Sequence, residues 1–414
     1  MKHQNSATPV NNAGRTDQDN PMSAATRRST HVAYLDGLRA IAALFVLLHH
    51  VWLNDSSRPL YSGAQTLTLR LTGFLGLGHF AVDLFIVLSG FCLSLPILKS
   101  HGTLVGGALQ FYKRRAKRIL PPYYAALAFS LILIATVIGH KTGTHWDVSL
   151  PVTKSGIVSH VLLAENIWKP AEINHVLWSV AVEWQIYFFF PLFLFLFRKT
   201  GMWTTAIATT AITIAMFQVG SRHFPQTSNF FEGINLPYYA LFVYGMTAAY
   251  LAHPNEHSRQ MPSRGLWKWL AICSALAIAF IVVAKGLTWV QWHAWLLDYL
   301  VGACAAASLI SAAIDETSLL RRVCSWRPLV FIGTFAYSLY LIHAPLIQVI
   351  WQYLVRPMHI SPDQGYWVLA FAGPLLIVPT AYLFFLLFEK PFLRRRLAET
   401  TAEIERDAAL IPAP

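Results

Sequence analysis

The sequence predicts an all-α membrane protein, a polytopic bundle of about ten transmembrane helices. Hydrophobic residues make up 55% of its 414 residues and charged residues only 13%, whereas a soluble domain carries about 25% charged residues. Apolar segments long enough to cross a bilayer as helices recur between polar loops. Ten such segments can be drawn, at about 34–53, 74–98, 119–139, 177–197, 203–220, 235–252, 268–284, 293–314, 328–351 and 366–388.

The distribution of lysine and arginine predicts that both termini lie in the cytoplasm. With that orientation the inside segments hold 23 of the 32 Lys and Arg residues and the outside loops hold eight. This is the bias expected of cytoplasmic loops. The net charge of +12 therefore reflects membrane topology, and we do not expect nucleic acid as a partner. We find no internal repeat of fixed period, which argues against a transporter built from inverted repeats.

The apolar segments also divide the chain into regions. Residues 1–30 are polar and contain no apolar stretch, so we expect a disordered cytoplasmic tail rather than a signal peptide. A membrane domain is expected over 31–392 and a second cytoplasmic tail over 393–414. The four cysteines are scattered and lack metal-ligand spacing, so neither a metal site nor a disulfide framework is expected.

The first apolar segment carries an arginine and a histidine on one helical face. Arg39 and His50 are eleven residues apart, which at about 100° per residue is three turns plus roughly 20°. The helix rise separates them by roughly 16 Å. Asp36 falls near the same face, whereas His49 points roughly 80° away and is expected to bond a neighbouring helix. Ionisable groups inside a membrane span mark function by default.

A basic run before the third span supplies further cations near the inner face. Within residues 113–118, Arg115 and Arg118 are i,i+3 neighbours and share one face of a helix. The run has two interpretations. It anchors the topology, as any basic loop does, or it clamps phosphates with paired guanidinium groups near a helix N-terminus. The second interpretation suits a cytoplasmic, phosphate-rich donor such as acyl-CoA.

Four ionisable residues are expected in the outer half of the membrane, where they would form an acid–base chamber: His50, Asp83, Glu183 and His343. An unpaired carboxylate at Glu183 would be very unfavourable, so it is expected to pair with a cation or a polar substrate. Asp83 would orient the imidazole of His50. Trp178, near Glu183, has two interpretations: it belongs to an interfacial aromatic belt, or it stacks on a sugar ring.

Six segments stand out as motifs in a fixed order. They are Tyr34–Ala40 with His50 after it, Val82–Phe91, Arg115–Pro121, Leu177–Glu183, Tyr337–Pro345 and Glu389–Phe392. Together they resemble the acyltransferase type 3 family, integral membrane proteins that modify bacterial surface polysaccharides and lipids. The resemblance covers most of residues 34–392. Each motif alone has low specificity, but six in the right order are highly specific.

The resemblance implies an enzyme of the bacterial inner membrane that takes an acyl group, usually acetyl, from cytoplasmic acyl-CoA. No bound cofactor is implied, and the acceptor is a carbohydrate or glycolipid of the cell envelope. The family's arginine–histidine pair corresponds to Arg39 and His50, and its R-x-x-R donor motif to Arg115 and Arg118. Ala81 departs from the glycine that is usual there. We expect a stand-alone member, without a fused extracytoplasmic domain.

We therefore expect an O-acyltransferase in which Arg39, Arg115 and Arg118 hold the donor near the inner face. His50 would act as a general base on the acceptor hydroxyl, an effect worth roughly 10²–10⁴-fold in rate. A transient acyl-enzyme that carries the group outward is the other mechanism that the sequence allows.

The remaining ionisable residues have supporting roles in this hypothesis. Glu183 and Asp83 would act with His50 by orienting its imidazole or the acceptor. His343 and Trp178 are further candidates for the acceptor site. The alternative function is a proton-coupled secondary transporter that exports a small anionic metabolite, in which the same His, Asp and Glu side chains relay protons.

Overall fold

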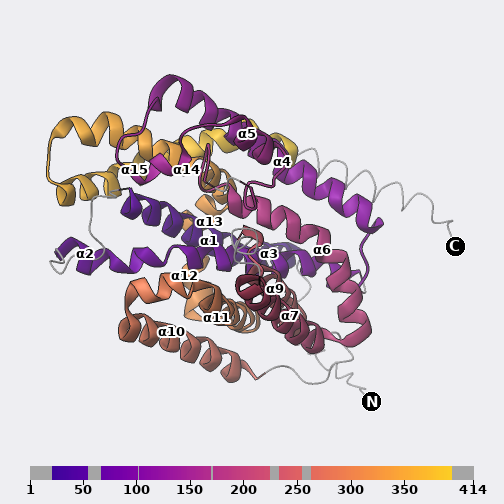
Figure 1. Ribbon diagram of the computed structural model, residues 1–414. Helices are drawn as coiled ribbons and strands as arrows, with labels where there is room; N and C mark the ends of the chain where they lie inside the picture. The colour runs from indigo at the N-terminus through magenta and orange to yellow at the C-terminus, as the bar shows by residue number, and fades with distance from the viewer. Residues whose placement is uncertain are drawn as a thin grey trace, which may run out of the picture.

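Helices are the only regular secondary structure in the part of the chain that the computed structural model describes (Figure 1). The described residues are 21–54, 67–100, 102–168, 171–223, 233–253 and 263–393. The expected all-α fold is confirmed. The two expected tails lie largely outside the described residues, and helix α1 begins at Pro21, upstream of the expected boundary at residue 31.

Fourteen α-helices and six short 3₁₀ or π segments make up the described fold. The α-helices are α1 (Pro21–Leu53), α2 (Leu67–Thr72), α3 (His79–Lys99), α4 (Gly107–Leu133), α5 (Lys154–Val161), α6 (Trp178–Thr200), α7 (Met202–His223), α9 (Pro237–Ala252), α10 (Arg264–Trp292), α11 (Ala294–Ile314), α12 (Leu319–Cys324), α13 (Arg327–Gly333), α14 (Ala336–Ile350) and α15 (Pro362–Phe384). The short segments are η1 (Gly73–Leu77), η2 (Ile134–Ile138), η3 (His145–Ser149), η5 (Trp351–Val355), η6 (Arg356–Met358) and η7 (Phe385–Glu389).

Nine helical segments within the described ranges are long and apolar enough to cross a membrane, and each overlaps an expected span. The tenth expected span, 235–252, corresponds to α9, which has only 16 residues. At about 1.5 Å per residue α9 is roughly 24 Å long, shorter than a hydrocarbon core of about 30 Å. Eleven of its 16 residues are buried, including Tyr238, Phe242 and Met246, and it packs against α3 and α11. Helix α9 is therefore a core helix of the bundle.

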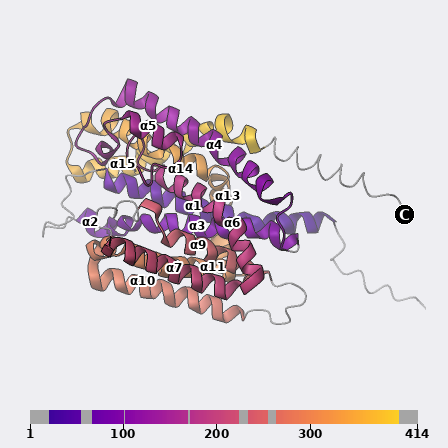
Figure 2. The same cartoon turned by 45° about the vertical axis from the view of Figure 1, so that its right-hand side comes forward.

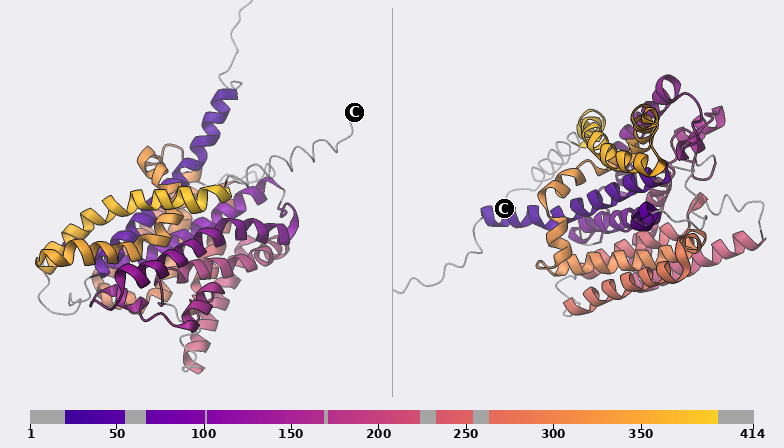
Figure 3. Two further views of the ribbon diagram at one scale, coloured as in Figure 1. Left: turned by 90° about the horizontal axis from the view of Figure 1, so that it is seen from above. Right: turned by 90° about the vertical axis from the view of Figure 1, so that its left-hand side faces the viewer.

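Helices α1 and α3 lie at the centre of the bundle (Figures 1 and 2). Helix α1 contacts α3, α12, α13, α14 and α15, and its N-terminal end projects from the bundle (Figure 3). Helix α10 packs along α11 at the edge and exposes apolar side chains such as Phe280 and Val283. An apolar surface of this kind is what a helix facing lipid presents. The central position of α1 places Arg39 and His50 inside the bundle.

The loop between α4 and α6 folds back onto the bundle. The Asn174 side-chain amide donates to Ser130 Oγ at 3.0 Å and to the Leu341 carbonyl oxygen at 3.1 Å. The Thr144 hydroxyl donates to Gln348 Oε1 at 2.7 Å. These bonds satisfy buried polar groups, which would otherwise be costly. They also hold the loop, with its histidines, over one end of the bundle.

Glycines set the close approach of α3 and α9. A Cβ atom on Gly90 would lie 2.0 Å from the Phe242 carbonyl oxygen, and one on Gly245 would lie 2.0 Å from the Val87 carbonyl oxygen. Small residues allow membrane helices to pack backbone against backbone. Gly90 and Gly245 therefore form a reciprocal contact that fixes the position of α3.

We predict that Gly90→Ala lowers the melting temperature of the protein purified in detergent. The added methyl group must displace α9, and overpacking of this kind costs roughly 1–3 kcal/mol. Gly73→Ala is the matched control, because a Cβ atom there meets nothing within 4 Å. If the Gly90→Ala protein had the same melting temperature as the wild type, this would contradict the close contact.

Candidate functional site

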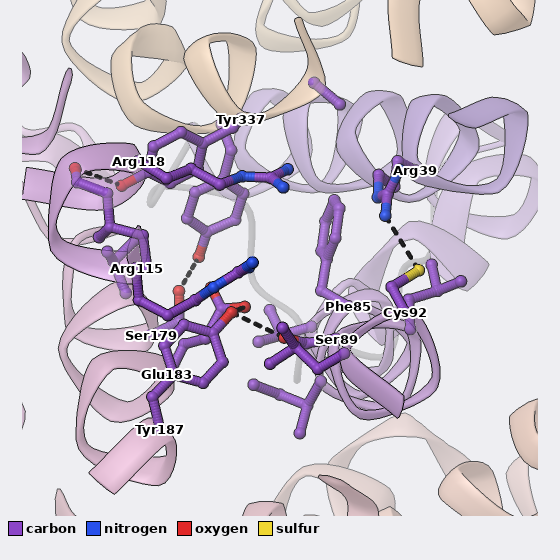
Figure 4. A pocket seen from close by; sticks show the side chains of 18 of the residues that line it. Arg39, Phe85, Ser89, Cys92, Arg115, Arg118, Ser179, Glu183, Tyr187 and Tyr337 are labelled. Carbon is purple, nitrogen blue, oxygen red and sulfur yellow. Dashed lines mark hydrogen bonds between the residues drawn. The ribbon is translucent and has the colours of Figure 1, made fainter. Parts of the chain in front are cut away.

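A cavity of about 280 Å³ lies between α1, α3, α4, α6 and α14 (Figure 4). It contains all three arginines that the sequence assigned to donor binding, and we call it the arginine pocket. Apolar side chains of α3 form much of its wall. Its polar lining residues are Arg39, Ser89, Cys92, Arg115, Arg118, Ser179, Glu183, Tyr187, Tyr337 and Tyr340.

Arg39 reaches the arginine pocket from α1. Its guanidinium donates to Asp36 Oδ1 at 2.5 Å and to Cys92 Sγ at 3.1 Å. The expectation that Asp36 shares the face of Arg39 is confirmed. The Asp36 carboxylate on the preceding turn thus offsets part of the charge of Arg39, and the contact with Cys92 holds its side chain toward α3.

Arg115 and Arg118 enter the arginine pocket from one face of α4, as their spacing predicted. The Arg115 guanidinium lies 5.8 Å from the centroid of the Phe111 ring, a cation–π contact. Arg118 lies close enough to Tyr337 and Glu389 to interact with them electrostatically. The pocket therefore gathers three guanidinium groups from two helices, a cationic environment suited to phosphate oxygens.

Glu183 also lines the arginine pocket, which differs from its expected place in a chamber with His50. The Tyr187 hydroxyl donates to Glu183 Oε1, and the Ser89 and Tyr187 hydroxyls lie 2.7 Å apart. Ser179, Glu183 and Tyr187 are four residues apart along α6, so they form one stripe that faces the pocket. The sequence alone did not define the direction in which Glu183 points.

His50 lies in a separate group of imidazoles, which we call the histidine cluster: His49, His50, His145, His175 and His343. The centroid of the His50 ring lies 4.9 Å from the ring centroid of His343, 5.2 Å from that of His175 and 5.0 Å from that of His49. His49 bonds the Leu75 carbonyl oxygen through Nδ1 at 2.7 Å, which confirms its expected contact with a neighbouring segment.

Hydrogen bonds define the tautomers of His50 and His343. His50 Nδ1 lies 2.9 Å from the Val46 carbonyl oxygen, and His343 Nδ1 lies 2.6 Å from the Tyr340 carbonyl oxygen. A carbonyl oxygen only accepts, so both Nδ1 atoms carry hydrogen. His343 Nε2 is then an acceptor, 3.1 Å from His50 Nδ1. This arrangement leaves the lone pair of His50 on Nε2, as a general base requires.

Two members of the histidine cluster, His145 and His175, were not identified from the sequence. They lie in the loop between α4 and α6, and their ring centroids are 4.9 Å apart. Burial lowers the pKa of His145, and burial with neighbouring imidazoles lowers the pKa of His175 well below its ordinary value. Both are therefore neutral near pH 7. The position of His175 beside the motif Leu177–Glu183 was the signal that the sequence offered.

Tyr340 separates the arginine pocket from the histidine cluster. Its side chain lines the pocket, where its hydroxyl lies 2.5 Å from Ser179 Oγ and donates to the Val176 carbonyl oxygen at 3.1 Å. Its own carbonyl oxygen accepts the Nδ1 hydrogen of His343. One residue of α14 thus contacts both sites, so the two sites adjoin.

Asp83 points away from His50, contrary to its expected role as the carboxylate that orients this imidazole. It faces His79 and Asp298, with ligand atoms of the three residues within 4.8 Å of one another. Val82 and Ile86 on the same helix line the arginine pocket. Because successive helical residues are rotated by about 100°, Asp83 is directed toward α9 and α11 instead.

Trp178 forms an aromatic stack beside this carboxylate. Its ring lies 6.3 Å from that of His79 at an interplanar angle of 12°, and 6.1 Å from that of Tyr238 at 28°. Trp178 is half-buried. Both earlier interpretations of Trp178, in an aromatic belt or at an acceptor sugar, remain hypotheses.

The known proteins that this chain resembles are named as acyltransferases or O-acetyltransferases. A family model described as an acyltransferase domain matches residues 32–386. O-acetyltransferase OatA of Staphylococcus aureus (strain NCTC 8325 / PS 47) is 26% identical over 335 residues, which cover 78% of this chain and 51% of the relative. A Bacillus subtilis (strain 168) protein, YrhL, named as a candidate peptidoglycan O-acetyltransferase, is 25% identical over 343 residues. The match covers 78% of this chain and 49% of the relative.

A Staphylococcus aureus (strain COL) protein named as a candidate O-acetyltransferase is 25% identical over 354 residues, covering 80% of this chain and 53% of the relative. The chain thus spans about half the length of the curated relatives that it matches. No solved structure matches the chain.

Proposed function

The chain belongs to the acyltransferase type 3 family, and from this premise we propose that it transfers an acyl group from acyl-CoA to a hydroxyl of a cell-envelope carbohydrate or glycolipid. Acetyl is the acyl group that we propose, since the relatives are named as O-acetyltransferases. The name of the Bacillus subtilis relative, which refers to peptidoglycan, supports a glycan acceptor. We place the protein in the bacterial inner membrane, with the arginine pocket toward the cytoplasm.

The observation that carries this proposal is the contact between a cationic pocket and a neutral histidine cluster through Tyr340. The arginine pocket offers guanidinium groups for the phosphates of the donor. Its volume of about 280 Å³ is small beside the roughly 300–1,000 Å³ of drug-sized ligand sites. It suits the narrow pantetheine arm and thioester, with the nucleotide held at its mouth. The thioester would then reach the Ser179 and Tyr340 hydroxyls.

The reaction would use His50 as its base. The acceptor hydroxyl gives its proton to His50 Nε2 while its oxygen attacks the thioester carbonyl carbon. The carbon–sulfur bond breaks, and the CoA thiolate takes up a proton as the imidazole returns to its neutral form. The Ser179 hydroxyl, which lines the pocket, would donate to the developing oxyanion in place of its contact with Tyr340. His343 would hold the tautomer of His50. The family assignment favours this enzyme over the transporter alternative.

We predict that His50→Ala lowers kcat for acyl transfer by roughly 100-fold or more, the range of a lost general base. His343→Ala should have a smaller effect, because it removes one acceptor that orients the Nδ1 hydrogen of His50. His49→Ala should retain substantial activity, since His49 bonds a backbone carbonyl instead. CoA release from acetyl-CoA by purified proteins of matched melting temperature is the measurement. Full activity in His50→Ala would refute the assignment of the base.

We also predict that Arg115→Lys and Arg118→Lys each raise the dissociation constant for acetyl-CoA about tenfold. A charge-assisted hydrogen bond contributes roughly 1.5–3 kcal/mol, and lysine cannot reproduce a bidentate guanidinium contact. Arg114→Lys is the matched control, because Arg114 bonds the Val105 carbonyl oxygen outside the pocket. Isothermal titration in detergent, repeated at higher salt, measures the change. If all three variants bind as the wild type does, these arginines serve only as a membrane anchor.

A further inference from the structure

Three metal-ligand side chains meet outside the arginine pocket and the histidine cluster. His79 and Asp83 are four residues apart on α3 and share a helical face, and Asp298 comes from α11. Their ligand atoms lie within 4.8 Å of one another. His79 Nε2 is 3.1 Å from Asp298 Oδ1. We call these residues the α3–α11 trio.

Asp83 is the member of the trio whose charge lacks compensation. Its side chain is 0% exposed, and neither carboxylate oxygen has a hydrogen-bond partner within the described ranges. The groups that face it are the Asp298 carboxyl, the Tyr238 hydroxyl and the His79 imidazole, whose Nε2 bonds Asp298 instead. Asp298 is itself only 3% exposed. Two carboxylates buried side by side in a membrane bundle require a counter-charge, because each is very costly alone.

We propose that the α3–α11 trio binds one divalent metal ion of the Zn²⁺ type. Imidazole nitrogen and carboxylate oxygen are the donors of such sites. Two atoms bound to one Zn²⁺ at about 2.0–2.2 Å lie roughly 3–3.5 Å apart, close to the 3.1 Å at which His79 Nε2 and Asp298 Oδ1 now form a hydrogen bond. A neutral imidazole with two carboxylates carries a charge of −2, which a divalent ion cancels.

The surroundings of the trio also suit a bound ion. Three protein ligands leave a fourth position for water. The His79 side chain is 34% exposed, which gives an ion a route to the two buried carboxylates. The indole of Trp178 covers the His79 ring. The bound ion would join α3 to α11. The sequence predicted no metal site, because its residues do not show that Asp298 lies beside a helix 219 positions earlier.

Metal titration of the full-length, tag-free protein tests the proposal. The protein is stripped with EDTA, dialysed and titrated with ZnCl₂ at neutral pH, with MnCl₂ as a second probe. We expect one Zn²⁺ per chain. Asp83→Asn and Asp298→Asn should each weaken binding by at least the roughly 10–100-fold that loss of an outer-shell partner costs. His145→Ala, in the histidine cluster, is the control and should retain the wild-type affinity.

Melting temperatures distinguish a variant that has lost a metal ligand from one that binds Zn²⁺ poorly because it is misfolded. Zn²⁺ should raise the melting temperature of the wild type as its concentration rises, but not that of Asp83→Asn. Without metal, Asp83→Asn should melt no lower than the stripped wild type, since the neutral amide removes a buried charge. The proposal is overturned if the wild type binds no Zn²⁺, in which case a proton neutralises the trio. It is equally overturned if His145→Ala loses the ion and Asp83→Asn keeps it.

Discussion

The fixed rise of helix α1 between Arg39 and His50 is the constraint on which the rest of the site depends. Eleven residues of α-helix separate the two side chains by roughly 16 Å along the axis and return them to nearly the same face. Because α1 is packed on α3, α12, α13, α14 and α15, this separation cannot change without displacing the core. The arginine pocket and the histidine cluster are consequently built at two set depths, and Tyr340 of α14 contacts both.

The cost of polar groups in a membrane explains how the two sites differ. The arginine pocket concentrates charge, and there Asp36, Glu183 and Tyr187 supply carboxylate and hydroxyl partners. In the histidine cluster, His49, His50 and His343 instead bond backbone carbonyl oxygens through Nδ1. A charged donor and a neutral base therefore occupy separate environments.

Helix periodicity and composition predicted the features that depend on one helix at a time. Nine of the ten expected spans, the shared face of Arg39 and Asp36 and the shared face of Arg115 and Arg118 are confirmed. Features that depend on how helices are rotated about their axes were not predictable. Glu183 faces the arginine pocket and Asp83 faces α11, not His50 as expected.

The loop histidines were missed for a related reason. His145 and His175 have no helical period to indicate a partner, and the hydrogen bonds that fold their loop onto the bundle join residues far apart in the sequence, such as Thr144 and Gln348.

The most direct test of the account uses sealed proteoliposomes supplied outside with acetyl-CoA that carries a labelled acetyl group. The account predicts that CoA is released outside while the label, as acetyl product or acetate, appears inside. Release of both on the same side would contradict transfer from the arginine pocket to the histidine cluster.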